Sequence, residues 1–150
     1  MVEEKEYGKL YPKKFDKVLL DAPCSGEGRF IGSEAKTYRN WSERTVKDLV
    51  KVQKKLFKSA YEALKDNGIM VYSTCTLNKE ENEEILNWAI ENLGVKLLDI
   101  EFDIKDKLPI YSDNLDKNIQ KAIKILPTKS QEGFFIAKLI KNYKAVSLVK

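Results

Sequence analysis

The sequence contains no histidine and only two cysteines, Cys24 and Cys75, among its 150 residues. The absence of histidine excludes Cys–His and Ser–His nucleophile pairs, a histidine general base and histidine-ligated zinc. Two thiols are too few for a structural zinc site, and we therefore expect no metal. In a reducing cytosol the two thiols are expected to be free. A catalytic cysteine in this chain has to act without an imidazole partner.

The sequence also lacks long apolar runs. No stretch approaches the ~18 apolar residues that a membrane helix needs, and the first six residues lack the basic start and apolar core of a signal peptide. Hydrophobic residues make up 43% of the chain and charged residues 33%, which is typical of a globular domain. We therefore expect a cytoplasmic protein with one domain and its own core.

Charge of one sign is not in strong excess. Lysine and arginine together number 27 against 23 aspartate and glutamate, which gives a net charge of +4. This mildly basic balance permits binding to nucleic acid but does not by itself indicate it.

Two apolar runs each lead into one of the cysteines. The runs predict buried strands at 16–20 and 69–73, and the residues between them predict a helix over 43–65. A strand–helix–strand unit has parallel strands, which end at the same edge of the sheet. Cys24 and Cys75 should therefore lie together at a carboxyl-end crevice, where open α/β sheets bind ligands.

Several local signals place the ends of these elements. The apolar run within 16–20 suggests a strand buried on both faces. Ser42 is the expected N-cap of the first helix, and Asn67-Gly68 is its expected C-terminal signal. The loop over 24–40 contains three glycines, but not at the spacing of a dinucleotide-binding loop, and we expect structural roles for them.

The second half of the chain predicts one more helix and two more strands. The helix is expected over 79–92, with Asn78-Lys-Glu-Glu81 as a capping box and Gly94 at its end. The acidic run at 80–84 is then explained by the helix dipole rather than by a metal site. Remaining segments are expected as follows: strands near 95–100 and 133–140, a short turn or helix around 114–123, and an extended segment at 125–127.

At this point three motifs carry a resemblance. They are Asp-Ala-Pro-Cys-Ser-Gly-Glu-Gly at 21–28, Tyr-Ser-Thr-Cys-Thr-Leu-Asn-Lys-Glu-Glu-Asn at 72–82, and Glu-Gly-Phe-Phe-Ile-Ala-Lys at 132–138. In this order, over about 15–141, the sequence resembles the Nop/Sun family of RNA 5-methylcytosine methyltransferases, and its bacterial ribosomal-RNA members most of all. The resemblance implies an α/β fold: the carboxyl-terminal half of a Rossmann-like, S-adenosylmethionine-dependent methyltransferase, with a mixed sheet whose last strand is antiparallel.

The same resemblance implies roles for the site residues. Cys75 matches the family nucleophile, which adds to carbon 6 of cytosine, and Cys24 matches the cysteine that assists release of the methylated base. Asp21 matches the aspartate beside the methyl donor and the cytosine ring, with Ala22 and Pro23 on the cofactor side. The implied cofactor is S-adenosyl-L-methionine. The implied partner is RNA, ribosomal RNA being favoured over transfer RNA.

The chain departs from the family pattern in one respect. The glycine-rich loop, similar to Ala-x-Pro-Gly-Gly-Lys-Thr, that cradles the cofactor is absent, as are the acidic residues of the next strands and the RNA-binding region. We therefore expect residues 1–150 to form a partial catalytic domain that binds the cofactor weakly or not at all by itself. The strand at 16–20 should present an open edge that favours self-association or an upstream half.

Two other functions remain open. One is a non-catalytic remnant or split-enzyme subunit that binds RNA or a partner chain. The other is a thiol redox protein, which is disfavoured because Cys24 and Cys75 do not have Cys-x-x-Cys spacing.

Overall fold

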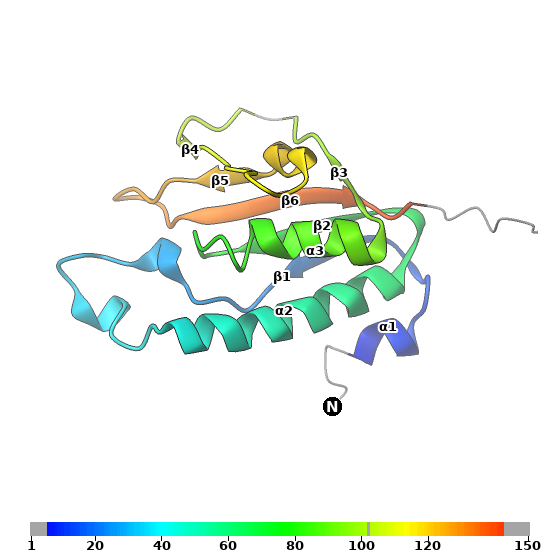
Figure 1. Cartoon of the computed structure of the whole chain (residues 1–150), viewed down its shortest axis with the longest axis horizontal. Coiled ribbons are helices and arrows are strands. Elements are labelled where there is room, and N and C mark those ends of the chain that lie inside the picture. The colour runs from blue at the N-terminus through cyan, green and yellow to red at the C-terminus, as the bar shows by residue number, and fades with distance from the viewer. Residues whose placement is uncertain (1–5, 102, 143–150) are drawn as a thin grey trace, which may run out of the picture.

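A six-stranded mixed sheet forms the centre of the computed structural model, which describes residues 6–101 and 103–142. The strands pair in the order β1-β2-β6-β5-β4, and β3 also pairs with β6 (Figure 1). The strands are β1 (Phe15–Asp21), β2 (Leu64–Thr74), β3 (Lys96–Leu98), β4 (Lys107–Leu108), β5 (Ile123–Ile125) and β6 (Phe134–Ile140). The α-helices are α1 (Tyr7–Leu10), α2 (Glu43–Ala63) and α3 (Glu83–Leu93), and the 3-10 turns are η2 (Glu27–Arg29), η3 (Ala35–Thr37) and η4 (Lys117–Lys121).

The strand directions are those that the sequence predicts. β1 pairs with β2 in parallel, with Asp21 opposite Ser73 at the carboxyl end. β6 runs antiparallel to β2, with Thr74 opposite Phe135. The predictions of adjacent, parallel first strands and an antiparallel last strand are confirmed.

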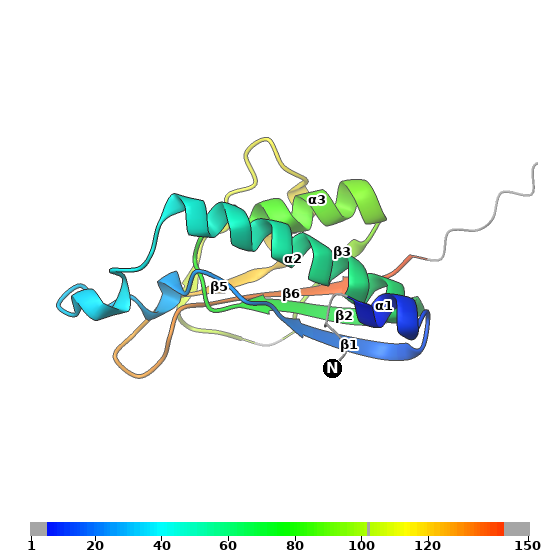
Figure 2. The same ribbon diagram turned by 90° about the horizontal axis from the view of Figure 1, so that it is seen from below.

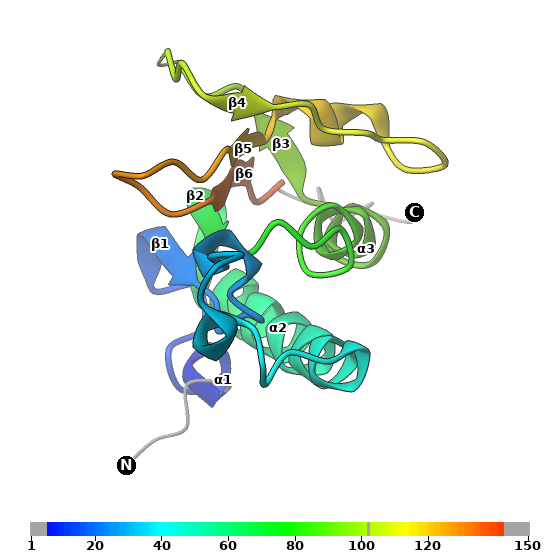
Figure 3. The ribbon, with the colours of Figure 1, turned by 90° about the vertical axis from the view of Figure 1, so that its left-hand side faces the viewer.

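Helices α2 and α3 lie on one side of the central strands, as Figures 2 and 3 show. The core between these layers is largely aliphatic and includes three aromatic rings in contact: the Phe57 ring of α2 lies 5.5 Å from Tyr72 of β2 and 6.2 Å from Trp88 of α3. Ser42 caps α2 as predicted, since its hydroxyl accepts the N–H of Thr45. Helix α2 thus begins at a capped residue and packs against β1 and β2 through one face, while its other face is exposed.

The end of α2 differs from the prediction. The helix stops at Ala63 and β2 begins at once, so Asn67-Gly68 is not the helix C-cap. The backbone N–H groups of Lys13 and Lys14 donate to the carbonyls of Glu62 and Ala63, and these contacts satisfy the helix end instead. Asn67 has a positive φ of 63° and forms an irregularity within β2.

The prediction of a capping box at Asn78–Glu81 before α3 is wrong. The helix begins at Glu83 with Asn82 in the cap position, and Asn78 instead accepts the N–H of Glu80 in a separate turn. Only Glu83 and Glu84 of the acidic run occupy the first helical turn. Gly94 ends the helix in the left-handed conformation, at φ 69°, as predicted.

The minor elements are shorter than the sequence suggests. The third predicted strand covers only Lys96–Leu98, and the predicted turn around 114–123 contains η4. The extended segment at 125–127 contributes only Ile125 to a strand, β5.

Strand β1 is one edge of the sheet and is partly exposed. Val18 and Leu20 are half-buried, but Leu19 between them is 71% exposed, so the prediction of burial on both faces is wrong. Helix α2 covers one face of β1, and within 6–101 and 103–142 the strand pairs with β2 alone. None of the described helices is long and apolar enough to cross a membrane.

Candidate functional site

The two thiols lie in contact at the carboxyl ends of β1 and β2. The sulfur atoms of Cys24 and Cys75 are 3.1 Å apart, and both cysteines are free and partly buried. The parallel pairing of β1 and β2 ends both strands at one edge, which brings together two residues 51 positions apart. The predicted juxtaposition is confirmed.

Gly28 connects the loop after β1 to the Cys75 loop and to the β5–β6 connection. Its N–H donates to the carbonyl of Cys75 at 3.0 Å, and its carbonyl accepts the N–H of Gly133 at 2.8 Å. A Cβ at this position would lie 2.1 Å from the Gly133 oxygen, so only glycine allows the approach. The loop after β1 and the β5–β6 connection accordingly meet at the same end of the sheet in Figure 1.

A cleft of about 620 Å³ opens over the thiols. It is lined by Asp21, Ala22, Pro23, Cys24, Arg29, Cys75, Glu132 and Phe134. Every site residue predicted from the sequence is in this lining. Arg29, Glu132 and Phe134 were not predicted, although Arg29 directly follows Gly28 and Glu132 opens the third motif.

The two sulfur atoms have different electrostatic surroundings. Burial first, and then the neighbouring Cys75, raise the pKa of the Cys24 thiol to about 12. Arg29 donates from Nη2 to the Cys75 sulfur at 2.7 Å, and that contact raises the pKa of the guanidinium. A cation in contact with one sulfur favours negative charge there. The two thiols thus differ: Cys75 is in contact with a cation, whereas the raised pKa of Cys24 keeps its proton in place.

Arg29 is itself oriented by the third motif. Its Nε lies 3.2 Å from a carboxylate oxygen of Glu132, although both side chains are more than half exposed. Asp21 lies across the cleft, where one carboxylate oxygen accepts the Ser73 hydroxyl at 2.9 Å. The cleft thus has a cation on the Cys75 side and an exposed carboxylate at the end of β1.

A buried polar network lies beneath the thiols. Glu81 is fully buried, and its carboxylate accepts the N–H and hydroxyl of Ser25 and the side-chain amide of Gln53. Asn82, also fully buried, accepts the Thr74 hydroxyl and donates to the carbonyl of Thr76. Neither residue was predicted as part of the site, because a helix start explains the acidic run in the sequence.

Within 6–101 and 103–142, no group of three histidine, cysteine, aspartate or glutamate side chains could hold a metal ion.

Comparisons with known proteins point in one direction. The family described as "16S rRNA methyltransferase RsmB/F" matches residues 2–140. Ribosomal RNA small subunit methyltransferase F of Vibrio atlanticus is 41% identical over 138 residues, which are 90% of this chain and 28% of that protein. The corresponding protein of Serratia proteamaculans is 37% identical over 145 residues, 96% of this chain and 29% of its own length.

Solved structures give the same result for the fold. A methyltransferase homolog protein from Pyrococcus horikoshii superposes with a TM-score of 0.75 and 34% identity, over 93% of this chain and 43% of that one. NSun6 from Pyrococcus horikoshii, solved with SFG, gives a TM-score of 0.75 and 30% identity, over 95% of this chain and 34% of that one. The chain thus has the fold of part of a methyltransferase, and it spans less than a third of the length of the curated relatives.

Proposed function

Because the chain belongs to the 16S rRNA methyltransferase RsmB/F family, we propose that residues 1–150 are the carboxyl-terminal half of the catalytic domain of an RNA cytosine-5 methyltransferase. The reaction proposed is methyl transfer from S-adenosyl-L-methionine to carbon 5 of cytosine through a covalent adduct. The observation that carries this proposal is the thiol pair, with a cation on Cys75 and a proton held on Cys24.

The thiolate of Cys75 supplies the nucleophile. Carbon 5 of cytosine is a poor nucleophile, and addition of the Cys75 sulfur to carbon 6 makes carbon 5 enamine-like. Arg29 stabilises the thiolate before attack, since it donates directly to that sulfur. S-adenosylmethionine, when bound, supplies the electrophilic methyl group.

Cys24 assists release of the methylated base. Release requires that carbon 5 lose its proton and that the bond between carbon 6 and the Cys75 sulfur break. Cys75 is one of two causes of the raised pKa of Cys24, and its charge disappears once its sulfur is bonded to carbon 6. Formation of the adduct therefore lowers the pKa of Cys24, so that this thiol can give up its proton to solvent at that stage. The Cys24 thiolate then takes the carbon 5 proton, the electron pair of that C–H bond forms the bond between carbons 5 and 6, and the Cys75 sulfur leaves as a thiolate.

Asp21, Ala22 and Pro23 form the cofactor side of the cleft. Asp21 offers an exposed carboxylate to the cytosine ring or the methyl donor, and Ala22 and Pro23 offer backbone and apolar surface. These residues fit one side of a cofactor site, but no loop similar to Ala-x-Pro-Gly-Gly-Lys-Thr stands beside them among the described residues. We expect this chain alone to bind S-adenosylmethionine weakly or not at all.

The cofactor site is completed by a further segment that packs against β1. A second hollow, of about 480 Å³, lies between β1 and α2, and its lining includes Phe15, Leu19 and Leu56. Phe15 and Leu19 are large exposed apolar side chains on an edge strand, which favours addition of a strand from an upstream half or a second copy. The relatives contain more than twice the matched length, enough to supply such a half.

RNA is the proposed substrate, with ribosomal RNA favoured because the family is described by that activity. The target base has to leave its stack to reach sulfur atoms at the floor of a cleft, which favours single-stranded or loop RNA.

A non-catalytic subunit that binds RNA or a partner chain is the second candidate. This candidate is favoured because the chain covers only 28% of the Vibrio atlanticus relative. The sequence also contains no loop similar to the family's glycine-rich cofactor loop.

Complementation by a relative separates the two candidates. The Vibrio atlanticus protein lacking its matched region would be mixed with this chain, and S-adenosylmethionine binding followed by calorimetry. Methyl transfer to 16S rRNA would be measured in the same mixture. Binding and transfer by the mixture, with neither component active alone, is the expected result. Micromolar cofactor binding by this chain alone would contradict the partial-domain proposal. Transfer that persists with Cys75→Ala would contradict the mechanism.

A further inference from the structure

Two consecutive buried residues form hydrogen bonds to the loops that carry Cys24 and Cys75. Glu81 and Asn82 are fully buried, and they follow β2 in the turn before α3. The proposed reaction gives neither a role, because neither is in the lining of the thiol cleft.

Glu81 holds the loop that carries Cys24 at the residue before Cys24 and at the residue after it. Its carboxylate accepts the Ser25 N–H at 2.9 Å and the Ser25 hydroxyl at 2.5 Å. It also accepts the Gln53 amide at 2.9 Å, and the same amide nitrogen donates to the Pro23 carbonyl at 2.8 Å. The neighbours of Cys24 on each side are therefore tied, directly or through Gln53, to one carboxylate.

Asn82 fixes the loop that carries Cys75 in the same way. Its side-chain oxygen accepts the Thr74 hydroxyl at 2.6 Å, and its amide donates to the Thr76 carbonyl at 2.9 Å. The Ser25 and Thr76 hydroxyls, 3.0 Å apart, connect the two loops directly.

The segment that holds both loops is itself fixed at several points. The Tyr72 hydroxyl donates to the Glu81 carbonyl at 2.8 Å from within β2. Glu83, which follows Asn82, is buried and forms an ion pair with Lys124 of β5. The Glu81-Asn82 pair is thus anchored to two strands and has little freedom to move.

We propose that Glu81 and Asn82 are positioning residues that set the separation of the two thiols, Glu81 through the Cys24 loop and Asn82 through the Cys75 loop. A buried carboxylate is expensive to maintain for stability alone, because apolar residues of similar volume fill a core at lower cost. Three donors aimed at one carboxylate do, however, fix a loop strongly, since hydrogen bonds to charged groups are the strong ones. That this separation matters for methyl transfer rests on the proposed function, whereas the control of the thiol separation by Glu81 and Asn82 does not.

A trivalent arsenical measures this separation in the chain as it stands. Phenylarsine oxide reacts with two neighbouring thiols: two arsenic–sulfur bonds form, and the oxygen leaves as water with both thiol protons. Because two sulfur atoms 3.1 Å apart can share one arsenic atom, the wild-type chain should bind the probe tightly. The assay needs neither cofactor nor RNA, so its outcome is independent of the proposed activity.

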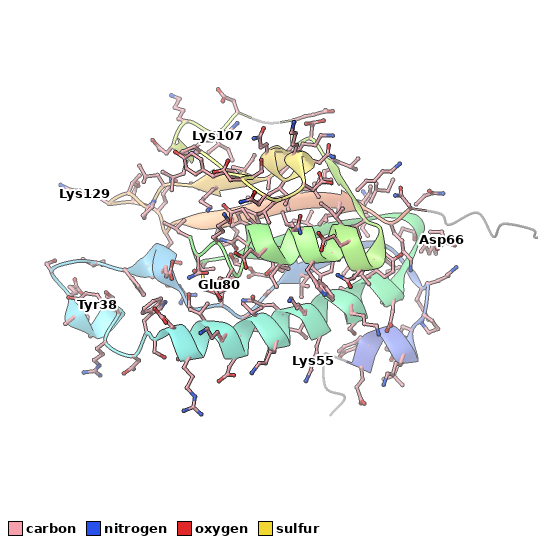
Figure 4. All side chains as sticks on the ribbon, in the orientation of Figure 1. Tyr38, Lys55, Asp66, Glu80, Lys107 and Lys129 are labelled. Atoms are coloured by element: carbon pink, nitrogen blue, oxygen red, sulfur yellow. The ribbon has the colours of Figure 1, made fainter. Side chains whose placement is uncertain are left out.

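The variants are Glu81→Met and Asn82→Leu, each with a control that makes the same change at a nearby exposed position. Glu80→Met removes a carboxylate that is solvent-exposed at the start of the same region, near α3 in Figure 4, and Asn92→Leu alters an exposed asparagine of α3. We expect each of the first pair to weaken arsenical binding about tenfold or more, as loss of a strong buried hydrogen bond implies. Each control should leave binding unchanged.

Conservative variants separate positioning from general destabilisation. Glu81→Gln retains an oxygen for Ser25 N–H and Gln53, and should bind the arsenical more tightly than Glu81→Met. Should either first variant fail to fold, Ser25→Ala and Thr74→Val test the same contacts one at a time, and each should weaken binding. Folded variants whose melting temperature falls while arsenical binding stays at the wild-type level would overturn the proposal. So would equal weakening in Glu80→Met and Asn92→Leu.

Discussion

Replacement of Gly28 by alanine tests how closely the loops around the thiols are packed. The added Cβ would lie 2.1 Å from the Gly133 oxygen and 2.9 Å from the Cys75 oxygen. Both are backbone atoms, so the loops have to separate and the hydrogen bonds that Gly28 makes to Cys75 and Gly133 weaken together. Two lost hydrogen bonds and the steric displacement correspond to about 2–4 kcal/mol of unfolding free energy.

Two other glycines in the same loop supply the controls. Gly32 has open space where a Cβ would be placed, and Gly32→Ala should change stability by less than about 1 kcal/mol. Gly26 also has open space but a φ of +76°, so Gly26→Ala should cost about 1–2 kcal/mol through backbone strain alone. Denaturant unfolding and thermal melts measure all three, and Gly28→Ala should lower Tm by roughly 5–15 °C. A Gly28→Ala variant as stable as Gly32→Ala would refute the close approach.

Three further predictions concern the thiols and the sheet edge. Arg29→Met should slow alkylation of Cys75 by iodoacetamide at pH 7.5 about two- to fivefold, since an exposed charge pair is worth about 0.2–1 kcal/mol after solvent screening. Arg44→Met, which changes an exposed arginine of α2, is the control, and an unchanged rate in Arg29→Met would remove Arg29 from the mechanism. Burial and Cys75 raise the pKa of the Cys24 thiol to about 12, so alkylation of Cys24 should stay minor from pH 7 to 9 and rise only toward pH 12. Peptide mass spectrometry resolves the two cysteines, and equal labelling of both at pH 8 would contradict the difference between the thiols. Leu19→Lys should abolish any self-association seen by analytical ultracentrifugation, because it places a charge at the centre of the open edge, whereas Val52→Lys on α2 should not.

The thiol pair could be predicted from the sequence because it depends only on local patterns and on one general rule about parallel strands. Each apolar run identifies a strand, the helix between them makes the strands parallel, and parallel strands end at one edge. The cleft therefore follows from the strand ends, together with Asp21, Ala22 and Pro23 on its wall.

The role of Glu81 could not be predicted because its partners are remote. Ser25 and Gln53 are 56 and 28 positions away, whereas the helix-dipole explanation of the acidic run needs only adjacent residues. The same limit applies to Asn67-Gly68, which resembles a helix end until the carbonyls of Glu62 and Ala63 are seen to bind Lys13 and Lys14. Leu19 shows the opposite error: an apolar run suggests burial on both faces, although whether a second layer covers a strand depends on the rest of the fold.

The central claim is that the two thiols divide the reaction, and the complemented enzyme tests it most directly. Wild type, Cys75→Ala and Cys24→Ala would be incubated with S-adenosylmethionine and 16S rRNA, and covalent protein–RNA adducts separated on a denaturing gel. Cys75→Ala should form no adduct and transfer no methyl group, because the other thiol in the cleft, Cys24, has a raised pKa and keeps its proton. Cys24→Ala should accumulate the adduct, because attack remains intact while release is slowed. Accumulation with Cys75→Ala and loss with Cys24→Ala would show that the nucleophile is Cys24.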